Sequence, residues 1–164
     1  MNIKGIYHVN INCSDLEKSK AFYEMLGFRV QYPLQSEADP AGAGGLAAAL
    51  GLPRDSVVNG YMMQLGTDNA ACRLDLLSWK PYPGFQQGRP TPHMMNLGLQ
   101  RLNIWTKTED FDQDIAEIKR YGVEIVGQPM DGSFFGMPCK VFAFKDPDGT
   151  VIELSNVDPS YGVS

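Results

Sequence analysis

The sequence predicts an α+β fold of two paired β-α-β-β-β modules, whose curved mixed sheets surround a cleft. Two observations predict this class. The chain runs twice through the order strand, helix, glycine, strand, long loop, strand, turn and strand. In each half an acidic residue also follows a turn aspartate by seven positions, Asp75 after Asp68 and Glu153 after Asp146. Both acidic residues have apolar neighbours in a strand pattern, so they point to the opposite face from those neighbours.

The first half begins with a strand that is apolar on one side only. His8, Asn10 and Asn12 share the mostly polar face of this strand. Asp15 is placed to cap a helix that ends before Gly27. The predicted strands are 6–12, 28–32, 60–65 and 72–79, the second of them stopped by Pro33. Residues 33–59 are predicted to form a looser segment, with an alanine-rich helical turn in a lid over a site.

The second half repeats these signals. Asp110 or Asp112 is expected to cap a helix that ends at Gly122. Residues 128–138 are predicted to form a loop, and Asp146-Pro147-Asp148-Gly149 a hairpin turn. The predicted strands are 99–105, 123–126, 141–144 and 151–154.

Aligning the halves pairs their polar residues. His8 corresponds to Arg101, Asn10 to Asn103, and Asp75 to Glu153. The offset between the halves is 93 at the first pair and 78 at the last, so the first half carries 15 more residues, which the segment 33–59 explains. If both sheets face one cleft, His8, Asp75, Arg101 and Glu153 converge there.

Composition limits the partners and the compartment. A formal net charge of -5 over 164 residues argues against nucleic acid and membranes as partners. The three cysteines are scattered and form no CxxC pair, which favours a reducing compartment. Met1 leads almost directly into a strand pattern, and no apolar run approaches the roughly 20 residues that cross a bilayer. We therefore expect a cytoplasmic protein.

Two motifs carry a family resemblance. They are Asp15-Leu-Glu-Lys-Ser-Lys-Ala-Phe-Tyr-Glu-Met-Leu-Gly-Phe28 and Asp146-Pro-Asp-Gly-Thr-Val-Ile-Glu-Leu154, supported by Tyr7-His8-Val9 and Leu74-Asp-Leu76. With the repeat, the chain resembles the vicinal oxygen chelate superfamily over residues 4–156. That superfamily includes glyoxalases, extradiol dioxygenases, methylmalonyl-CoA epimerases and antibiotic-resistance proteins. The resemblance implies one glyoxalase-like domain, 1–160, with modules 4–79 and 98–156 joined by a linker, 80–97. It also implies a homodimer.

The resemblance further implies a metal site on the first and fourth strands of each module. Those positions hold His8, Asp75, Arg101 and Glu153, and the implied ion is divalent: Zn, Ni, Mn, Co or Fe. Arg101 stands where the family usually has His. A guanidinium has no lone pair and cannot be a ligand, so the implied metal ligands are His8, Asp75 and Glu153. His93 is considered as a spare ligand.

Arg101 has two alternative roles. It could pair with Glu153 or Asp75, or it could bind a substrate carboxylate or enolate. The expected catalytic residues are Glu153 or Asp75 as base, with His8 assisting and Arg101 stabilising charge. Asn10, Asn103 and Trp105 are expected to line the substrate pocket together with Arg101.

The resulting expectation is a glyoxalase-like enzyme. It would transfer a proton, as lyases and isomerases do, on a small oxygenated or carbonyl substrate in the cleft between the modules, either with a metal's help or with the charge of Arg101 alone. The alternative is a non-catalytic protein that binds a small molecule or an antibiotic. An extradiol dioxygenase is least favoured, because its iron site needs a His that Arg101 replaces.

Overall fold

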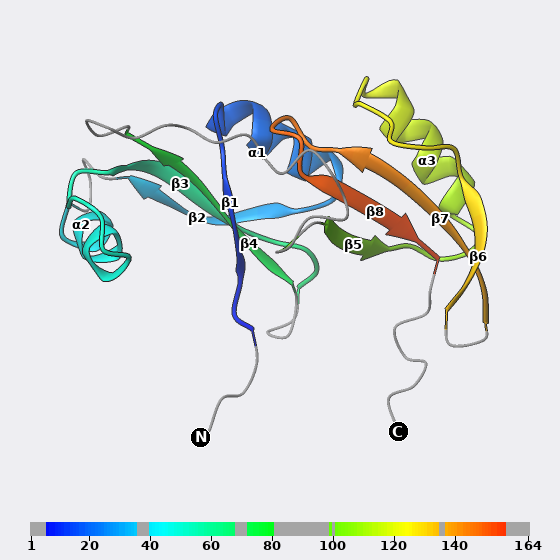
Figure 1. The fold of residues 1–164 in the computed structure, drawn as a ribbon, viewed down its shortest axis with the longest axis horizontal. Helices are drawn as coiled ribbons and strands as arrows, with labels where there is room; N and C mark the ends of the chain where they lie inside the picture. Colours follow the sequence, from blue (N-terminus) through cyan, green and yellow to red (C-terminus); the bar gives the residue numbers. More distant parts are fainter. Residues whose placement is uncertain are drawn as a thin grey trace. The chain divides into compact units, whose positions relative to one another are not determined.

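The structure is a computed structural model that describes residues 6–35, 40–67, 72–80, 99, 101–134 and 137–156. The chain divides into two compact units, Met1–Gly88 and Arg89–Ser164 (Figure 1). Each unit contains one four-stranded sheet, so we describe each by itself. The predicted module bounds 4–79 and 98–156, and the single domain 1–160, stay predictions. Most of the predicted linker 80–97 lies outside the described residues.

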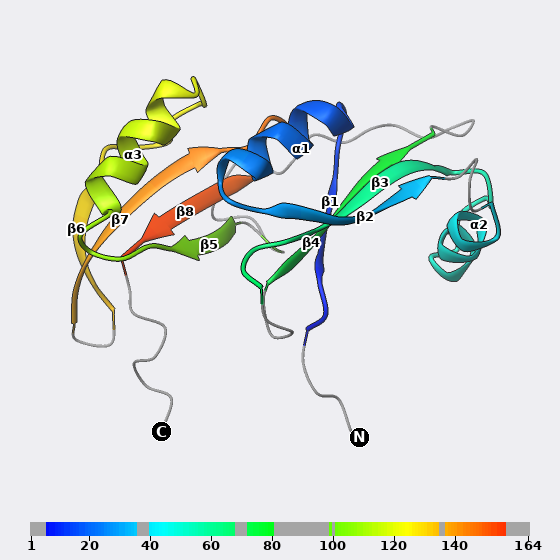
Figure 2. The same ribbon diagram turned by 180° about the vertical axis from the view of Figure 1, so that it is seen from behind.

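The first unit is a mixed sheet in the order β1-β4-β3-β2. Strand β1 runs parallel to β4, and the other neighbours are antiparallel. Its elements are β1 (Val9–Asn12), α1 (Leu16–Met25), β2 (Arg29–Gln35), α2 (Pro40–Ala49), β3 (Val57–Gln64) and β4 (Arg73–Trp79). Helix α1 covers one face of this sheet, as Figures 1 and 2 both show.

Helix α1 forms where its capping signal predicts. The side chain of Asp15 accepts a hydrogen bond from the backbone N–H of Lys18 at 3.1 Å. Gly27 ends the helix region with a φ of 95°, which a residue with a side chain adopts only at a cost. The helix buries Phe22 and Tyr23, and Leu74 and Leu76 of β4 are equally buried. The opposite face of the sheet carries the polar residues.

Within residues 28–59, the predicted end of the strand is wrong, and the predicted helical turn is present as a longer helix. Strand β2 continues through Pro33 to Gln35 and does not stop at the proline. Because β2 is the edge strand, the missing N–H of Pro33 has less effect there than in a central strand. The segment predicted to be loose contains a regular ten-residue helix, α2. Ala47 of this helix is fully buried, with Leu34, Leu52 and Trp79 packed against it.

The second unit repeats the arrangement in the order β5-β8-β7-β6. Strand β5 runs parallel to β8, and the remaining pairs are antiparallel. Its elements are β5 (Arg101–Trp105), α3 (Phe111–Arg120), β6 (Met130–Phe134), β7 (Met137–Lys145) and β8 (Val151–Ser155). Helix α3 buries Phe111, Ile115 and Ile118.

The predicted strand at 123–126 is wrong, and so is the predicted loop at 128–138. Ile125 makes only an isolated bridge to Phe144, whereas Met130–Phe134 forms β6. Strand β6 is an edge strand that pairs only with β7, so it can form on a sequence of low strand propensity that includes Gly132. Pairing with the longer strand β7 therefore determines where β6 forms.

The predicted hairpin turn is present between β7 and β8. The Asp146 carboxylate accepts hydrogen bonds from the backbone N–H groups of Asp148 at 3.0 Å and Thr150 at 2.8 Å. Gly149 has a φ of 94°, the left-handed conformation that glycine tolerates. The turn sets the register in which Glu153 lies between the buried side chains of Ile152 and Leu154.

The predicted α+β class of paired β-α-β-β-β modules is confirmed by these two mixed sheets and three helices of the described residues. Within the part of the chain that the structure describes, no helix has the length and apolar character needed to cross a membrane.

Candidate functional site

The strand register places equivalent polar residues at equivalent positions in the two sheets. Asn10 of β1 lies opposite Asp75 of β4, and Asn103 of β5 lies opposite Glu153 of β8. Both pairs are parallel, so the two side chains of a pair share one face of the sheet. The pairing of Asn10 with Asn103 and of Asp75 with Glu153, inferred from spacing, therefore matches the hydrogen-bonded register.

In the first unit, His8 and Asp75 form a pair. His8 Nε2 lies 3.9 Å from Asp75 Oδ2. The His8 side chain is 36% exposed, but that of Asp75 only 12%. Burial raises the pKa of the Asp75 carboxyl above its ordinary value, and the charge of His8 partly opposes this by lowering it. A carboxylate with a raised pKa accepts a proton more readily than an exposed one.

Three further side chains are connected to His8 through Tyr7. The Arg73 guanidinium lies 4.9 Å from the centre of the Tyr7 ring, and the Tyr7 and His8 rings meet edge to face. Burial raises the pKa of Tyr32, and its hydrogen bond with Tyr7 raises it further. The charge of Asp75 also acts on Tyr32. Tyr7 thus contacts His8, and because one phenol donates to the other, one O–H of the two remains to donate to another oxygen.

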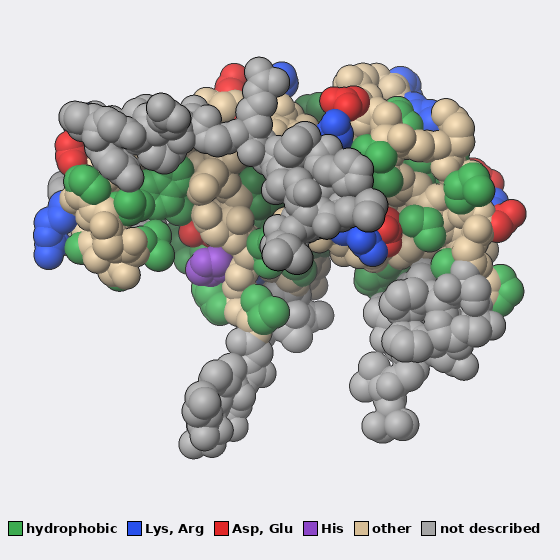
Figure 3. Space-filling model, viewed as in Figure 1, with side chains coloured by type: hydrophobic (Ala, Val, Ile, Leu, Met, Phe, Trp, Pro, Cys, Tyr) green, Lys and Arg blue, Asp and Glu red, His purple; other side chains and the backbone are tan. Residues whose placement is uncertain are grey.

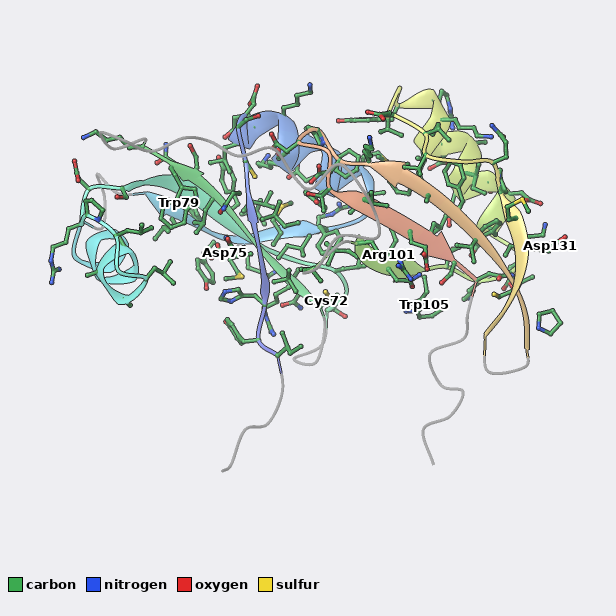
Figure 4. All side chains as sticks on the ribbon, in the orientation of Figure 1. Cys72, Asp75, Trp79, Arg101, Trp105 and Asp131 are labelled. Carbon is green, nitrogen blue, oxygen red and sulfur yellow. The ribbon has the colours of Figure 1, made fainter. Side chains whose placement is uncertain are left out.

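In the second unit, the equivalent carboxylate is already bound. Glu153 Oε2 accepts from Arg101 Nε at 2.9 Å, and Glu153 Oε1 accepts from Asn103 Nδ2 at 2.6 Å. The Ser155 hydroxyl donates to Asn103 Oδ1 at 3.1 Å, which fixes the amide. Of the two partners proposed for Arg101, the structure shows Glu153. Arg101 and Trp105 are both about half exposed on β5, and Figure 4 shows them on that strand.

The family model of the Glyoxalase/Bleomycin resistance protein/Dioxygenase superfamily matches residues 5–154. The chain belongs to this superfamily. Its members include both enzymes and resistance proteins, so membership leaves the reaction open.

Two sequence relatives extend over almost the whole chain. The uncharacterized protein YwkD of Bacillus subtilis (strain 168) is 31% identical over 158 residues, covering 94% of this chain and 98% of YwkD. The uncharacterized protein YaeR of Escherichia coli (strain K12) is 28% identical over 156 residues, covering 94% and 97%.

Solved structures share the fold. A glyoxalase family protein from Bacillus cereus superposes with a TM-score of 0.75 at 18% identity, covering 94% of this chain and 95% of that one. The fosfomycin resistance protein FosX from Listeria monocytogenes, solved as a point mutant with Mn(II) and 1S,2S-dihydroxypropylphosphonic acid, gives 0.60 at 16% identity. The match covers 96% of this chain and 93% of FosX. At these identities the likeness concerns the fold alone.

The His8–Asp75 pair and Glu153 differ in how readily they could bind a metal ion. Ligand atoms that bind one ion at about 2.0–2.2 Å can be at most about 4.4 Å apart, so His8 and Asp75 could share an ion. Both Glu153 oxygens accept hydrogen bonds, from Arg101 and Asn103, so a metal at Glu153 would lie beside the positive guanidinium and compete with it for the carboxylate. Among the described residues, no three His, Cys, Asp or Glu side chains gather closely enough to hold an ion.

The remaining expectations have mixed outcomes. Asn10 donates to the backbone carbonyl of Asp75 at 2.9 Å, so it supports the strand that carries the acid. His93, the proposed spare ligand, lies outside the described residues. The alternation of the strand placed Arg73 on the same face as Asp75, but Tyr7 and Tyr32 were not expected at the site. Tyr32 is brought close only by the tertiary structure, because it lies on β2.

Proposed function

We propose that this chain is a glyoxalase-like enzyme that transfers a proton next to the carbonyl of a small oxygenated substrate, with His8 and Asp75 as its acid–base pair. One observation carries the proposal: an imidazole lies 3.9 Å from a mostly buried carboxylate, at the positions where the family places its functional residues. A base must also be reachable by substrate: the Asp75 side chain keeps 12% of its surface exposed, and the more exposed His8 beside it can pass the proton on.

The proposed step needs no other reactant. Asp75, assisted by His8, takes a proton from the carbon beside the carbonyl, and the electron pair of the broken C–H bond moves onto the carbonyl oxygen as an enolate. In an isomerase acting on an α-hydroxy carbonyl compound, the α-hydroxyl proton passes to the enolate oxygen, and the same pair returns the abstracted proton to the former carbonyl carbon, so the carbonyl group moves by one carbon. The Tyr7–Tyr32 hydrogen bond uses one of the two hydroxyl protons, and the other O–H could stabilise the enolate oxygen.

A divalent ion would be held by His8 and Asp75. When bound, it would polarise the substrate carbonyl. The reported Mn(II) complex of FosX supports manganese as the first ion to test. In the second unit, Arg101 Nε donates to Glu153, and a guanidinium has about four further N–H donors, which suit a carboxylate or enolate.

The test of proton transfer is hydrogen exchange in D₂O. We would incubate the protein with dihydroxyacetone and other small carbonyl compounds, with and without Mn²⁺, and follow loss of the C–H signals by NMR. His8→Gln and Asp75→Asn are each expected to slow exchange by about 100-fold or more, as loss of an acid–base group does. Glu124→Gln, which removes an exposed carboxylate paired with Lys145, is the matched control and should not change the rate. Exchange that is equal in all four proteins would refute the acid–base role.

Metal content tests the ligand assignment separately. Protein purified without added metal or chelator is expected to contain, or to take up, about one equivalent of a divalent ion. His8→Ala should abolish uptake. Glu153→Ala should leave uptake unchanged, because Arg101 and Asn103 hold this carboxylate in the wild-type protein; reduced uptake would instead identify Glu153 as a third ligand. The absence of uptake in the wild-type protein would eliminate the metal-assisted form of the proposal.

The second candidate is a protein that binds a small molecule without turning it over, as a resistance protein can. The favouring observation is that Arg101 and Asn103 already occupy the carboxylate of Glu153, which leaves the second unit without a free base at that position. Saturable binding of a ligand with no exchange or turnover would favour this candidate. The missing His at position 101 keeps an extradiol dioxygenase the least supported alternative.

A further inference from the structure

The first unit contains a pocket. Of the residues expected at the site from the sequence, Asn10 lines it. Its volume is about 280 Å³. One wall is formed by the open face of β1 and the end of β4, and the other by the chain that follows α2. The lining residues are Asn10, Asn12, Leu50, Leu52, Ser56, Trp79 and Lys80.

Most of the lining is apolar and held in place. Leu52 and Trp79 pack against the buried Ala47 of α2. The indole Nε1 of Trp79 donates to Asn12 Oδ1 at 2.7 Å, which uses the only polar atom of the ring and leaves apolar surface. Figure 4 shows Trp79 at the end of β4 nearer to α2, and Figure 3 shows hydrophobic side chains gathered between α2 and the first sheet.

One polar group in the pocket has no partner. The Ser56 hydroxyl is the buried side-chain oxygen that makes no hydrogen bond among the described residues, in a residue only 3% exposed. Its backbone is fixed on both sides: Ser56 N–H donates to the Pro53 carbonyl at 3.0 Å, and the Ser56 carbonyl accepts from Lys80 N–H at 2.7 Å. A buried hydroxyl without a partner is unfavourable, and Ser56 lines the pocket, so a turn of its χ1 angle would let the hydroxyl pair with a ligand oxygen.

The pocket adjoins the proposed acid–base pair. Asn10 lines it and also donates to the Asp75 carbonyl. His8 and Asn10 are two residues apart on the same side of the strand, which corresponds to about 7 Å. A substrate with one end in the pocket would therefore place its other end near His8 and Asp75.

We propose that this pocket binds the apolar end of the substrate: a small, uncharged aromatic group whose hydroxyl or carbonyl oxygen pairs with Ser56. The volume exceeds that of an apolar cavity of about 150 Å³ that holds benzene, so it admits a ring with one or two substituents. The Lys80 ammonium is paired with Asp55 at 2.7 Å, which favours a neutral oxygen over an anion. The assignment of this group to a substrate rests on the proposed function, whereas binding in the pocket can be measured without it.

The probe is phenol, and toluene is the control of equal shape without the oxygen. Both are titrated into the full-length protein and followed by ¹H–¹⁵N NMR and by the thermal unfolding midpoint. The wild-type protein is expected to bind phenol about 5- to 10-fold more tightly than toluene, the gain from one hydrogen bond to a buried group. Ser56→Ala should abolish this preference while leaving toluene binding unchanged.

The thermal unfolding midpoint distinguishes a role of Ser56 in ligand binding from a purely structural role. Because the hydroxyl is unpaired, Ser56→Ala should keep or raise the unfolding midpoint of the unliganded protein, while it reduces the rise that phenol causes. Leu50→Trp is the second variant. Leu50 is 57% exposed, so the larger side chain should narrow the pocket without disturbing the core, and it should weaken phenol and toluene alike.

Phenol binding elsewhere, or a phenol preference that survives Ser56→Ala, would overturn the pocket assignment. The outcome is independent of the chemistry, because His8→Gln should leave phenol binding intact. Phenol binding with no proton exchange would support the pocket and refute the proposed reaction. Exchange with no phenol binding would refute the pocket alone.

Discussion

Gly60 in the middle of β3 has no room for a side chain. A Cβ added there would lie 2.6 Å from the Leu76 carbonyl oxygen and 2.6 Å from Leu77 Cδ2. The backbone of β4 cannot move without disturbing its pairing with β1 and β3, so we expect Gly60→Ala to lower the free energy of unfolding by about 1–3 kcal/mol. Urea unfolding measures this change.

The same substitution at Gly45 is the control and should have the opposite sign. Gly45 lies inside α2, and an added Cβ would meet no atom within 4 Å. Alanine favours a helix over glycine, so Gly45→Ala should raise the free energy of unfolding by about 0.5–1 kcal/mol. Equal effects at the two positions would contradict the close approach seen at Gly60.

The contribution of Tyr61 to the stability of the fold should be lost at high pH. Its hydroxyl donates to Glu17 Oε1 at 2.6 Å, and this hydrogen bond, followed by burial and the charge of Glu17, raises the pKa of Tyr61 above its ordinary value of 10.0. The folded state thus holds the phenol proton more tightly than the unfolded state. The stabilisation from this bond is fully present below pH 10.0 and is lost as the pH rises through the folded pKa.

Ultraviolet absorbance of the phenolate measures this titration, as the difference between the wild-type protein and Tyr61→Phe. Glu17→Gln should bring the pKa of Tyr61 back toward its ordinary value, because the charged acceptor is removed. Lys145→Gln, which changes a charge on another element, should have no effect on it. A Tyr61 pKa that does not respond to Glu17→Gln would contradict the assigned cause.

Helices α1 and α3 differ at their first residues. Asp15 accepts a hydrogen bond from Lys18 N–H, whereas Asp110 makes no side-chain capping bond at the start of α3. We expect Asp15→Ala to lower the free energy of unfolding by about 1 kcal/mol, the usual loss for a capping residue. Asp110→Ala should lower it by about half of that or less, since only its charge near the helix N-terminus is lost. Chemical denaturation of both variants tests the difference, and equal losses would contradict it.

At the scale of elements, sequence signals that act within a few residues correctly predicted where helices and turns begin and end. The cap at Asp15, the glycine after α1 and the Asp146 turn all act within a few residues, and each was found where predicted. The edge strands were misjudged. Pro33 is tolerated in β2, and Met130–Phe134 forms β6, because each has a partner strand that only the assembled sheet supplies.

The oligomeric state belongs to the whole molecule. The family resemblance predicts a homodimer, so sedimentation equilibrium should give twice the 18.1 kDa of one chain. A mass that equals one chain at micromolar concentration would contradict the homodimer. The cytoplasmic location likewise stays a prediction, tested by fractionation of the source cells.

The sequence by itself determined the repeat, the family and the pairing of His8 with Arg101 and Asp75 with Glu153. These depend on residue spacing and on the two-residue alternation of side chains along a strand, both of which can be read directly from the sequence. Only the tertiary structure decided which contacts those residues make. Arg101 pairs with Glu153, Asp75 is mostly buried beside His8, and Ser56 is left unpaired in a pocket with Trp79. Burial and hydrogen-bond partners depend on residues far apart in the chain, so the sequence pattern offered Glu153 and Asp75 as partners of Arg101 but could not choose between them.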